Sequence, residues 1–450
     1  MNTLKAGFGR VNITPMMGIS IAGYYIPRNA DGILDELEIN VLALADDSTR
    51  VLLINLDSLG IRAELSRAFR AHVAEVTGVP ADAIFISATH THTAPHLVDG
   101  SESEKVREYL RFVFHKIADA ARFALEDLKP ARMGFGVGEA PNIAFIRRFR
   151  MKDGSIRTNP GVNNPDILAP IGDVDERVNV LRFDREGAQT LILVNFASHP
   201  DVVGGCKISA DWPGLLRATV EKTLDNTRCI FFNGAQGDVN HVNVHPRGGD
   251  LNDMFIDFDD VSRGYGHARY IARVVTGGVL QAFDKVEYVD TDRVRFAQRI
   301  VNLPSNMPKK KDIPEARRIN DLHKAGRDSE LPYTGMLLTT VVAEAARMVL
   351  LENGPAAFPA VLSGITVGPV ALIGIPGEPF TNVGRRLKEA EGYSLILPCC
   401  CTNGYEGYFP MKEAYDEGGY EARSSRFKAG VAEQIIAEGK QLLKEMSKQI

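Results

Sequence analysis

The sequence has no long hydrophobic run, no stripe of basic residues and few cysteines. No apolar stretch in its 450 residues approaches the roughly 20 residues of a membrane-spanning helix, so we expect no membrane span. A formal net charge of −5 and the lack of a basic stripe argue against a nucleic-acid partner. Five cysteines suit a reduced interior better than a disulfide framework.

The first residues also lack a recognisable targeting pattern. Met1–Gly7 shows no charged start followed by an apolar segment, so we expect no secretory signal and a cytoplasmic location. Together with the ordinary composition, 44% hydrophobic and 24% charged, this predicts a soluble globular protein. We expect its partner to be a small-molecule substrate, and homo-oligomerisation stays open.

Strand and helix patterns alternate along most of the chain. Val51–Asp57 predicts a strand, whereas Arg62–Val76 and Glu104–Leu128 have apolar residues at helical spacing. Such alternation is typical of α/β proteins. We therefore expect one catalytic domain over residues 1–450, built on a mixed central sheet flanked by helices.

Two stretches interrupt this alternation. Residues 142–175 are rich in Arg, Asn, Pro and Gly and predict a long loop beside the sheet. Residues 302–335 contain Pro304, Pro308 and a lysine run, and predict a helical insertion or lid that buries little apolar surface of its own.

Four short apolar runs each end in residues that can bind a metal or handle protons. Short β-rich runs bounded by turn residues predict buried strands, and ligands collect beyond the carboxyl ends of strands in open α/β sheets. We therefore expect histidines and a glutamate to meet there and form a catalytic zinc site. The runs and the residues that follow them are Ala83–Ala88 with Thr89–His92, Leu191–Phe196 with Ser198–Pro200, Ile230–Phe232 with Asn233–Asp238, and Val370–Ile375 with Pro376–Pro379.

The individual residues support a metal. His90 and His92 are two positions apart, so on an extended segment they face the same way. His199 supplies a further imidazole, and a buried Glu378 must be paired, hydrogen-bonded or metal-bound. Strand-end carboxylates are candidates to orient the imidazoles: Asp57, Asp211 and Asp238.

Two polar features leave alternatives open. Arg147 and Arg148 lie in the 142–175 loop, where a guanidinium either steadies an oxyanion or is solvated at the surface. The span 403–421 is rich in Gly and Tyr, which predicts either phenols turned into a site or ordinary aromatic packing.

These motifs resemble the amino-terminal catalytic domain of the neutral/alkaline non-lysosomal ceramidases. They occur in the family's order over nearly the whole chain. The resemblance implies that zinc is held by His90, His199, Glu378 and Tyr408. It implies that His92 and Tyr420 assist catalysis and that the active-site arginine is Arg147, with Arg148 as a one-residue alternative. The motifs are Ala6-Gly7 through Ile13-Thr14-Pro15, Ala88–His92, Phe196–Pro200, Gly377-Glu378, and Gly407-Tyr408 with Tyr420-Glu421.

The chain also departs from the family. Ceramidases carry a carboxy-terminal immunoglobulin-like domain for which this chain is too short, and Asn240 stands where they have an active-site serine. We therefore expect a ceramidase-like paralogue that is a poor ceramidase.

We expect a zinc-dependent hydrolase that cleaves an amide or related acyl bond of a small, soluble substrate through zinc-activated water. One alternative is a zinc-dependent lyase or isomerase that removes a proton next to a carbonyl in a sugar-like compound. Another is a non-catalytic protein with structural zinc. An open coordination position distinguishes a catalytic ion from a structural one.

Overall fold

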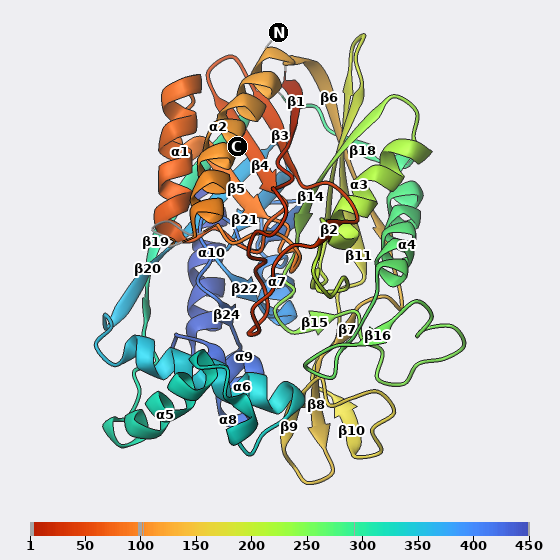
Figure 1. Ribbon diagram of the computed structural model, residues 1–450. Helices are drawn as coiled ribbons and strands as arrows, with labels where there is room; N and C mark the ends of the chain where they lie inside the picture. The colour runs from red at the N-terminus through yellow and green to blue at the C-terminus, as the bar shows by residue number, and fades with distance from the viewer. Residues whose placement is uncertain (1–3, 98–100, 102, 292, 449–450) are drawn as a thin grey trace.

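The computed structural model describes residues 4–97, 101, 103–291 and 293–448. Within these residues the chain forms a nine-stranded sheet, a four-stranded sheet and several short ribbons (Figure 1). The large sheet runs in the order β14 (Thr227–Asn233), β12 (Thr190–Phe196), β11 (Arg177–Arg185), β6 (Lys129–Glu139), β1 (Lys5–Asn12), β3 (Glu38–Ala45), β4 (Arg50–Leu56) and β5 (Ile84–Ala88), with β18 (Glu287–Tyr288) beside β6. The smaller sheet runs β19 (Val294–Pro304), β20 (Ala357–Val367), β21 (Val370–Gly374) and β23 (Leu395–Cys399).

Helices cover both sheets. In Figure 1, α1 and α2 lie over the part of the large sheet formed by β1, β3 and β5, and α3 and α4 lie over the part formed by β14, β11 and β6. The helices α7 and α10 pack on the four-stranded sheet through a separate apolar cluster. The helices are α1 (Ala63–Thr77), α2 (Glu104–Glu126), α3 (Asp211–Thr223), α4 (Tyr265–Phe283), α5 (Ile313–Lys324), α6 (Gly335–Leu351), α7 (Thr381–Leu387), α8 (Lys412–Glu417), α9 (Tyr420–Ser424) and α10 (Val431–Ser447).

The core follows the apolar periodicity of the sequence. On α1, Phe69 and Val73 are four residues apart, so both lie on the face that packs against the sheet, and both are fully buried. Burying such a side chain contributes about 1.5–3 kcal/mol, and Phe69→Ala should cost about 3–5 kcal/mol with the cavity it leaves.

The sheets are mixed, and the carboxyl ends of several strands meet. The pairs β4–β5, β12–β14 and β21–β23 are parallel, whereas most other neighbours are antiparallel. Backbone hydrogen bonds join the ends of three strands: Ala88 N–H donates to Cys401 O (3.2 Å) and Cys400 N–H to Asn233 O (2.9 Å). The predicted mixed α/β fold, with a candidate metal site at the carboxyl ends of strands, is confirmed.

The two irregular stretches are more structured than predicted. The prediction of a long loop over 142–175 is wrong, because β7 (Phe145–Ile146) and the three-stranded ribbon β10-β8-β9 lie there. Their strands are β8 (Arg148–Met151), β9 (Ile156–Thr158) and β10 (Ile167–Pro170). They are short and rich in arginine, so no apolar alternation marks them.

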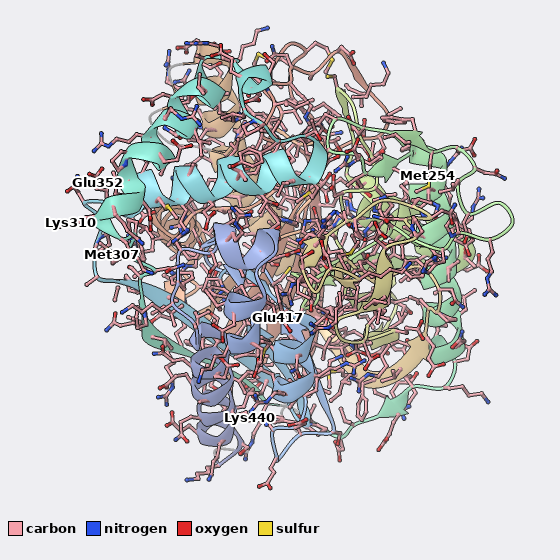
Figure 2. All side chains as sticks on the ribbon, turned by 90° about the horizontal axis from the view of Figure 1, so that it is seen from below. Met254, Met307, Lys310, Glu352, Glu417 and Lys440 are labelled. Atoms are coloured by element: carbon pink, nitrogen blue, oxygen red, sulfur yellow. The ribbon has the colours of Figure 1, made fainter. Side chains whose placement is uncertain are left out.

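The stretch 302–335 divides between a sheet and a helical hairpin. Residues 302–304 complete β19, α5 follows, and Gly335 begins α6. The expectation of little buried apolar surface is wrong, since α5 buries Ile313, Ala316 and Ile319. Figure 2 looks onto this end of the molecule and shows α5 and α6 lying across it.

Among the described residues, no helix combines the length and the apolar character needed to cross a membrane.

Candidate metal centre

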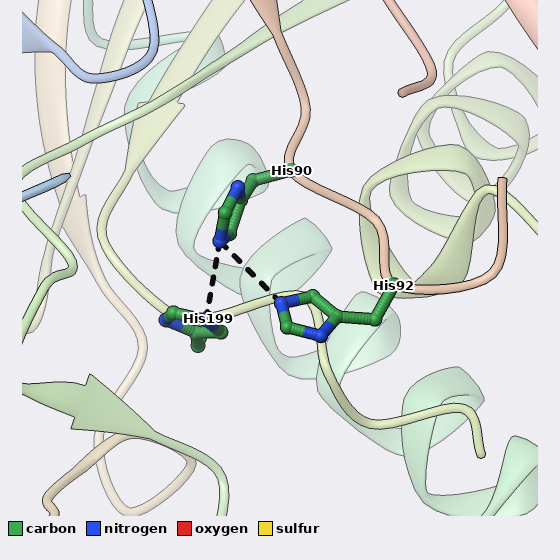
Figure 3. A group of neighbouring side chains, drawn as sticks. All are labelled: His90, His92 and His199. Atoms are coloured by element: carbon green, nitrogen blue, oxygen red, sulfur yellow. Dashed lines mark hydrogen bonds between the residues drawn. The ribbon is translucent and has the colours of Figure 1, made fainter. Parts of the chain in front are cut away.

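Three imidazole rings converge at the carboxyl ends of β5 and β12 (Figure 3). The Nε2 atom of His90 lies 3.2 Å from Nε2 of His199 and 3.4 Å from Nε2 of His92. All three side chains are buried. Within the described part of the chain, this is the one group of at least three His, Cys, Asp or Glu residues with ligand atoms within 4.8 Å of each other.

A buried carboxylate completes this group. Glu378 Oε2 lies 3.2 Å from Nε2 of His90 and 3.8 Å from Nε2 of His199, and the side chain is 0% exposed. Ligand atoms about 2.0–2.1 Å from a tetrahedral zinc ion are about 3.3 Å apart. The separations of these nitrogen and oxygen atoms therefore fit a shared metal ion.

The electrostatics keep these donors in the forms that bind cations. Burial alone would raise the pKa of Glu378, but His90, His199 and Arg147 outweigh it and hold this pKa well below its usual range. Burial lowers the pKa of His199 well below its usual value and that of His92 to about 3. At neutral pH the site therefore presents a carboxylate and uncharged rings at His92 and His199.

The backbone around His90 fixes the direction of its ring. His90 Nδ1 lies 2.6 Å from the carbonyl oxygen of Leu59, which can only accept, so Nδ1 carries the proton and Nε2 presents a lone pair. His90 has φ 75°, in the left-handed region, and its N–H donates to Ser58 O at 2.9 Å. A strained non-glycine residue held in this way is typical of functional sites.

Arg147 lies in the site and Arg148 points away from it. The Arg147 Nε atom donates to Glu421 Oε1 (2.6 Å), and its Nη2 donates to the Tyr408 hydroxyl (3.1 Å). Arg148 instead donates to Glu417 Oε2 (3.0 Å). Of these two guanidinium groups, that of Arg147 contacts the Tyr408 hydroxyl.

The tyrosine-rich span contributes several phenols. Glu378 in β22 (Glu378–Pro379) pairs with Tyr408 in β24 (Tyr408–Phe409), and the Tyr420 ring lies 5.5 Å from that of Tyr408 between centroids. Burial first, and then Glu378, raises the pKa of Tyr408, while Arg147 opposes them. A cation beside this phenol would favour its ionised form.

One phenol was missed by the sequence analysis. The Tyr405 hydroxyl donates to Glu378 Oε1 at 2.9 Å, so it orients the carboxylate whose other oxygen faces the histidines. Tyr405 belongs to the tyrosine-rich span, but nothing in the spacing distinguishes it from its neighbours.

The three predicted orienting aspartates have other partners, so this prediction is wrong. Asp57 pairs with Arg217, Asp211 accepts the N–H groups of Val202 and Val203, and Asp238 accepts the N–H and hydroxyl of Thr381. They stabilise loops and helix starts around the site. A different aspartate, Asp201, faces an imidazole of the site, with its Oδ1 3.6 Å from His92 Nδ1.

Asn240 lies in β15 (Val239–Asn240) and is linked to Arg147 by two hydrogen bonds through Asn159. Its Nδ2 donates to Asn159 Oδ1 at 2.8 Å, and the N–H of Asn159 donates to the Arg147 carbonyl at 2.8 Å. The Asn240 side chain is thus engaged with a neighbour.

Comparisons by structure give clear matches. The fold is similar to neutral ceramidase from Pseudomonas aeruginosa (TM-score 0.71, 17% identity, 99% of this chain and 74% of that one). It is similar also to a ceramidase complexed with C2 (TM-score 0.70, 17% identity, 99% of this chain and 76% of that one). No protein-family model matches the sequence, and a sequence search of curated proteins finds no match. The resemblance to ceramidases is therefore confirmed in the fold.

Proposed function

We propose that this protein is a zinc-dependent hydrolase that cleaves an amide or related acyl bond of a small, soluble substrate. The observation that carries the proposal is the convergence of His90, His199 and Glu378 at separations that suit one ion. The ceramidase-like fold adds support, because proteins of this fold include enzymes named for cleaving the amide of ceramide.

The zinc ligands in this proposal are His90, His199, Glu378 and Tyr408. Two imidazole nitrogens and a carboxylate form a common catalytic zinc set. The phenol is an unusual fourth ligand, and its support is the register that sets Tyr408 opposite Glu378. When bound, zinc supplies Lewis acidity and lowers the pKa of a water molecule towards about 7.

His92 acts in this proposal as the group that moves protons. Its Nε2 atom faces the same point as the ligand nitrogen of His90, from a ring that burial keeps uncharged. In that form it accepts a proton from the attacking water and returns it to the leaving amine. Such transfers contribute about 100- to 10,000-fold to a rate.

Arg147 and Tyr420 stabilise charge on the substrate carbonyl oxygen. The Glu421 carboxylate accepts a hydrogen bond from Arg147 Nε and fixes the guanidinium. The positive charge of Arg147 is therefore in place before the reaction begins. The Tyr420 ring lies 5.5 Å from that of Tyr408 between centroids, and in this proposal its hydroxyl donates to the same oxygen.

Asn240 is the reason for proposing a substrate other than ceramide. Its amide is bound to Asn159 and supplies no hydroxyl where the family has its serine. The test is a panel of N-acyl compounds of increasing chain length, with ceramide included and the released acid and amine measured. We expect fast hydrolysis of short compounds and slow hydrolysis of ceramide.

Equal turnover of ceramide and the best short substrate would contradict the proposed specificity. No hydrolysis at all by fully zinc-loaded protein would contradict the proposed function. Elimination or isomerisation products from sugar-like compounds would favour the lyase or isomerase alternative.

A further inference from the structure

We infer that Asp201 is a positioning residue that holds His92 in the tautomer protonated at Nδ1. The Nε2 atom, which faces the candidate metal ligands, is then unprotonated. This inference rests on the proposed function for its catalytic meaning. Its geometry, however, stands on contacts of Asp201 and His92 alone.

The two nitrogens of His92 face different groups. Nε2 lies 3.4 Å from Nε2 of His90, on the side where the candidate ligands meet. Nδ1 faces Asp201 Oδ1 at 3.6 Å and has no hydrogen-bond partner among the residues that the structure describes. A carboxylate accepts and cannot donate, so the proton of the neutral ring is stabilised on Nδ1.

A backbone hydrogen bond connects the segment of His92 with the segment of Asp201. The N–H of His92 donates to the carbonyl of Pro200, which directly precedes Asp201 (3.2 Å). On the other side, Arg28 Nη2 donates to the carbonyl oxygen of His92 at 2.6 Å. The loop that follows β12 therefore carries both the candidate ligand His199 and the carboxylate that faces His92.

Packing by Gly23 and Tyr24 restricts the movement of the His92 ring away from Asp201. Gly23 packs against it with φ 104°, and a Cβ added at that glycine would lie 2.8 Å from the Cγ and Nδ1 atoms of the ring. The Tyr24 ring covers a further side, with its centroid 5.7 Å from that of His92. The close contact at Gly23 thus helps to fix the ring orientation.

Asp201 is itself held rigidly. Arg263 donates from Nε to Oδ1 (2.9 Å) and from Nη2 to Oδ2 (2.8 Å), and the Tyr24 hydroxyl donates to Oδ1 (2.7 Å). Arg263 is 1% exposed and binds Asp259 on its other side. Removing a buried charge partner is costly, so this network keeps Asp201 ionised and aimed at one place.

The experiment measures the tautomer directly. Zinc-loaded protein labelled with ¹⁵N-histidine is studied by NMR, and the His92 signals are assigned by their loss in His92→Gln. We expect a protonated Nδ1 and an unprotonated Nε2 in the wild type. In Asp201→Ala we expect the Nε2–H form to appear. Asp259→Asn is the matched control: it neutralises a second carboxylate that binds Arg263, and it should keep the wild-type tautomer.

A wild-type His92 with an unprotonated Nδ1 would overturn the inference, and so would an unchanged tautomer in Asp201→Ala. Should Asp201→Ala fail to fold, Asp201→Asn replaces it, and the wild-type spectrum alone still decides. Because no substrate is involved, a protein without amidase activity can still pass this test. If the proposed function holds, Asp201→Ala should also lower kcat by about 10- to 100-fold with little change in KM.

Discussion

The two halves of the candidate site reach it by different structural routes. The histidine half, His90, His92 and His199, lies on loops that leave long, buried strands of the nine-stranded sheet. The polar half comes from two-residue strands, the single residue between β7 and β8, and the start of a short helix: Glu378 and Tyr408, Arg147, and Tyr420. Regular strands position the first half, whereas side-chain hydrogen bonds position much of the second.

The difference predicts how each half responds to mutation. A ligand on a rigid strand end can be lost without disturbing its neighbours, so the effect should fall on the metal. The polar half is cross-linked, because Arg147 joins Glu421 to Tyr408 and Tyr405 joins Glu378. Changes to Arg147 or Tyr420, which are not proposed ligands, should affect the geometry of catalysis more than metal content.

The largest effect is expected for His199→Ala. Loss of an imidazole ligand should remove the zinc and abolish activity, since the metal depends on few ligands. Metal analysis of the purified variant measures this, with His115→Ala on α2, which is not a candidate ligand, as the control. If His199→Ala binds zinc with full stoichiometry and affinity, the assignment of His199 as a ligand is wrong.

His92→Ala should separate catalysis from metal binding within the histidine half. We expect the variant to keep its zinc and to lose activity by about 100- to 10,000-fold. Zinc content and kcat are measured on the same preparation. Metal loss would instead make His92 a ligand, as its place in the three-histidine group allows.

Arg147→Lys tests the polar half. A lysine cannot bind Glu421 and Tyr408 together as the planar guanidinium does, so kcat should fall by about 100- to 1,000-fold while zinc is retained. The neighbouring Arg148→Lys is the matched control, and we expect little change in it. Equal losses in the two variants would mean that Arg147 acts only through stability.

The smallest effect is expected at the end of the molecule covered by α5 and α6. Tyr25 packs against the apolar cluster of this hairpin, and its ring lies 6.4 Å from that of Tyr420 between centroids. Replacing Asn306–Ser329 by a short Gly-rich bridge should leave a folded, zinc-loaded protein with roughly tenfold lower turnover, because a cover that excludes water is lost. Circular dichroism, metal analysis and kcat together decide the outcome.

Failure of this deletion to fold would contradict the lid prediction. The buried side chains of α5 make the deletion a demanding test, since it exposes apolar residues of α6 such as Val341 and Val342. A point variant, His323→Ala, is milder: its ring lies 6.3 Å from that of Tyr25 and it leaves the hairpin intact.

The sequence predicted those parts of the fold that follow apolar periodicity. The predicted elements Val51–Asp57 and Arg62–Val76 correspond closely to β4 and α1. The expectation that ligands collect beyond the carboxyl ends of strands correctly placed His90, His199 and Glu378 together. Buried strands and amphipathic helices have a strong periodic signal, and their ends follow from it.

What the sequence did not predict depends on pairing between distant residues. Asp57 was expected to orient an imidazole, yet it pairs with Arg217, 160 positions away. Asp201 carried no signal, because its partners Arg263 and Tyr24 come from other parts of the chain. Tyr408 was suggested by the family resemblance alone, since a phenol is a rare zinc ligand.

The most direct test of the account is X-ray absorption at the zinc edge, on wild-type protein and on His92→Ala. The account predicts one zinc ion per chain, bound by two imidazole nitrogens and by oxygen ligands from Glu378 and Tyr408, with the same shell in both proteins. A shell of three imidazoles that falls to two in His92→Ala, or a wild-type protein that binds no zinc, would contradict it.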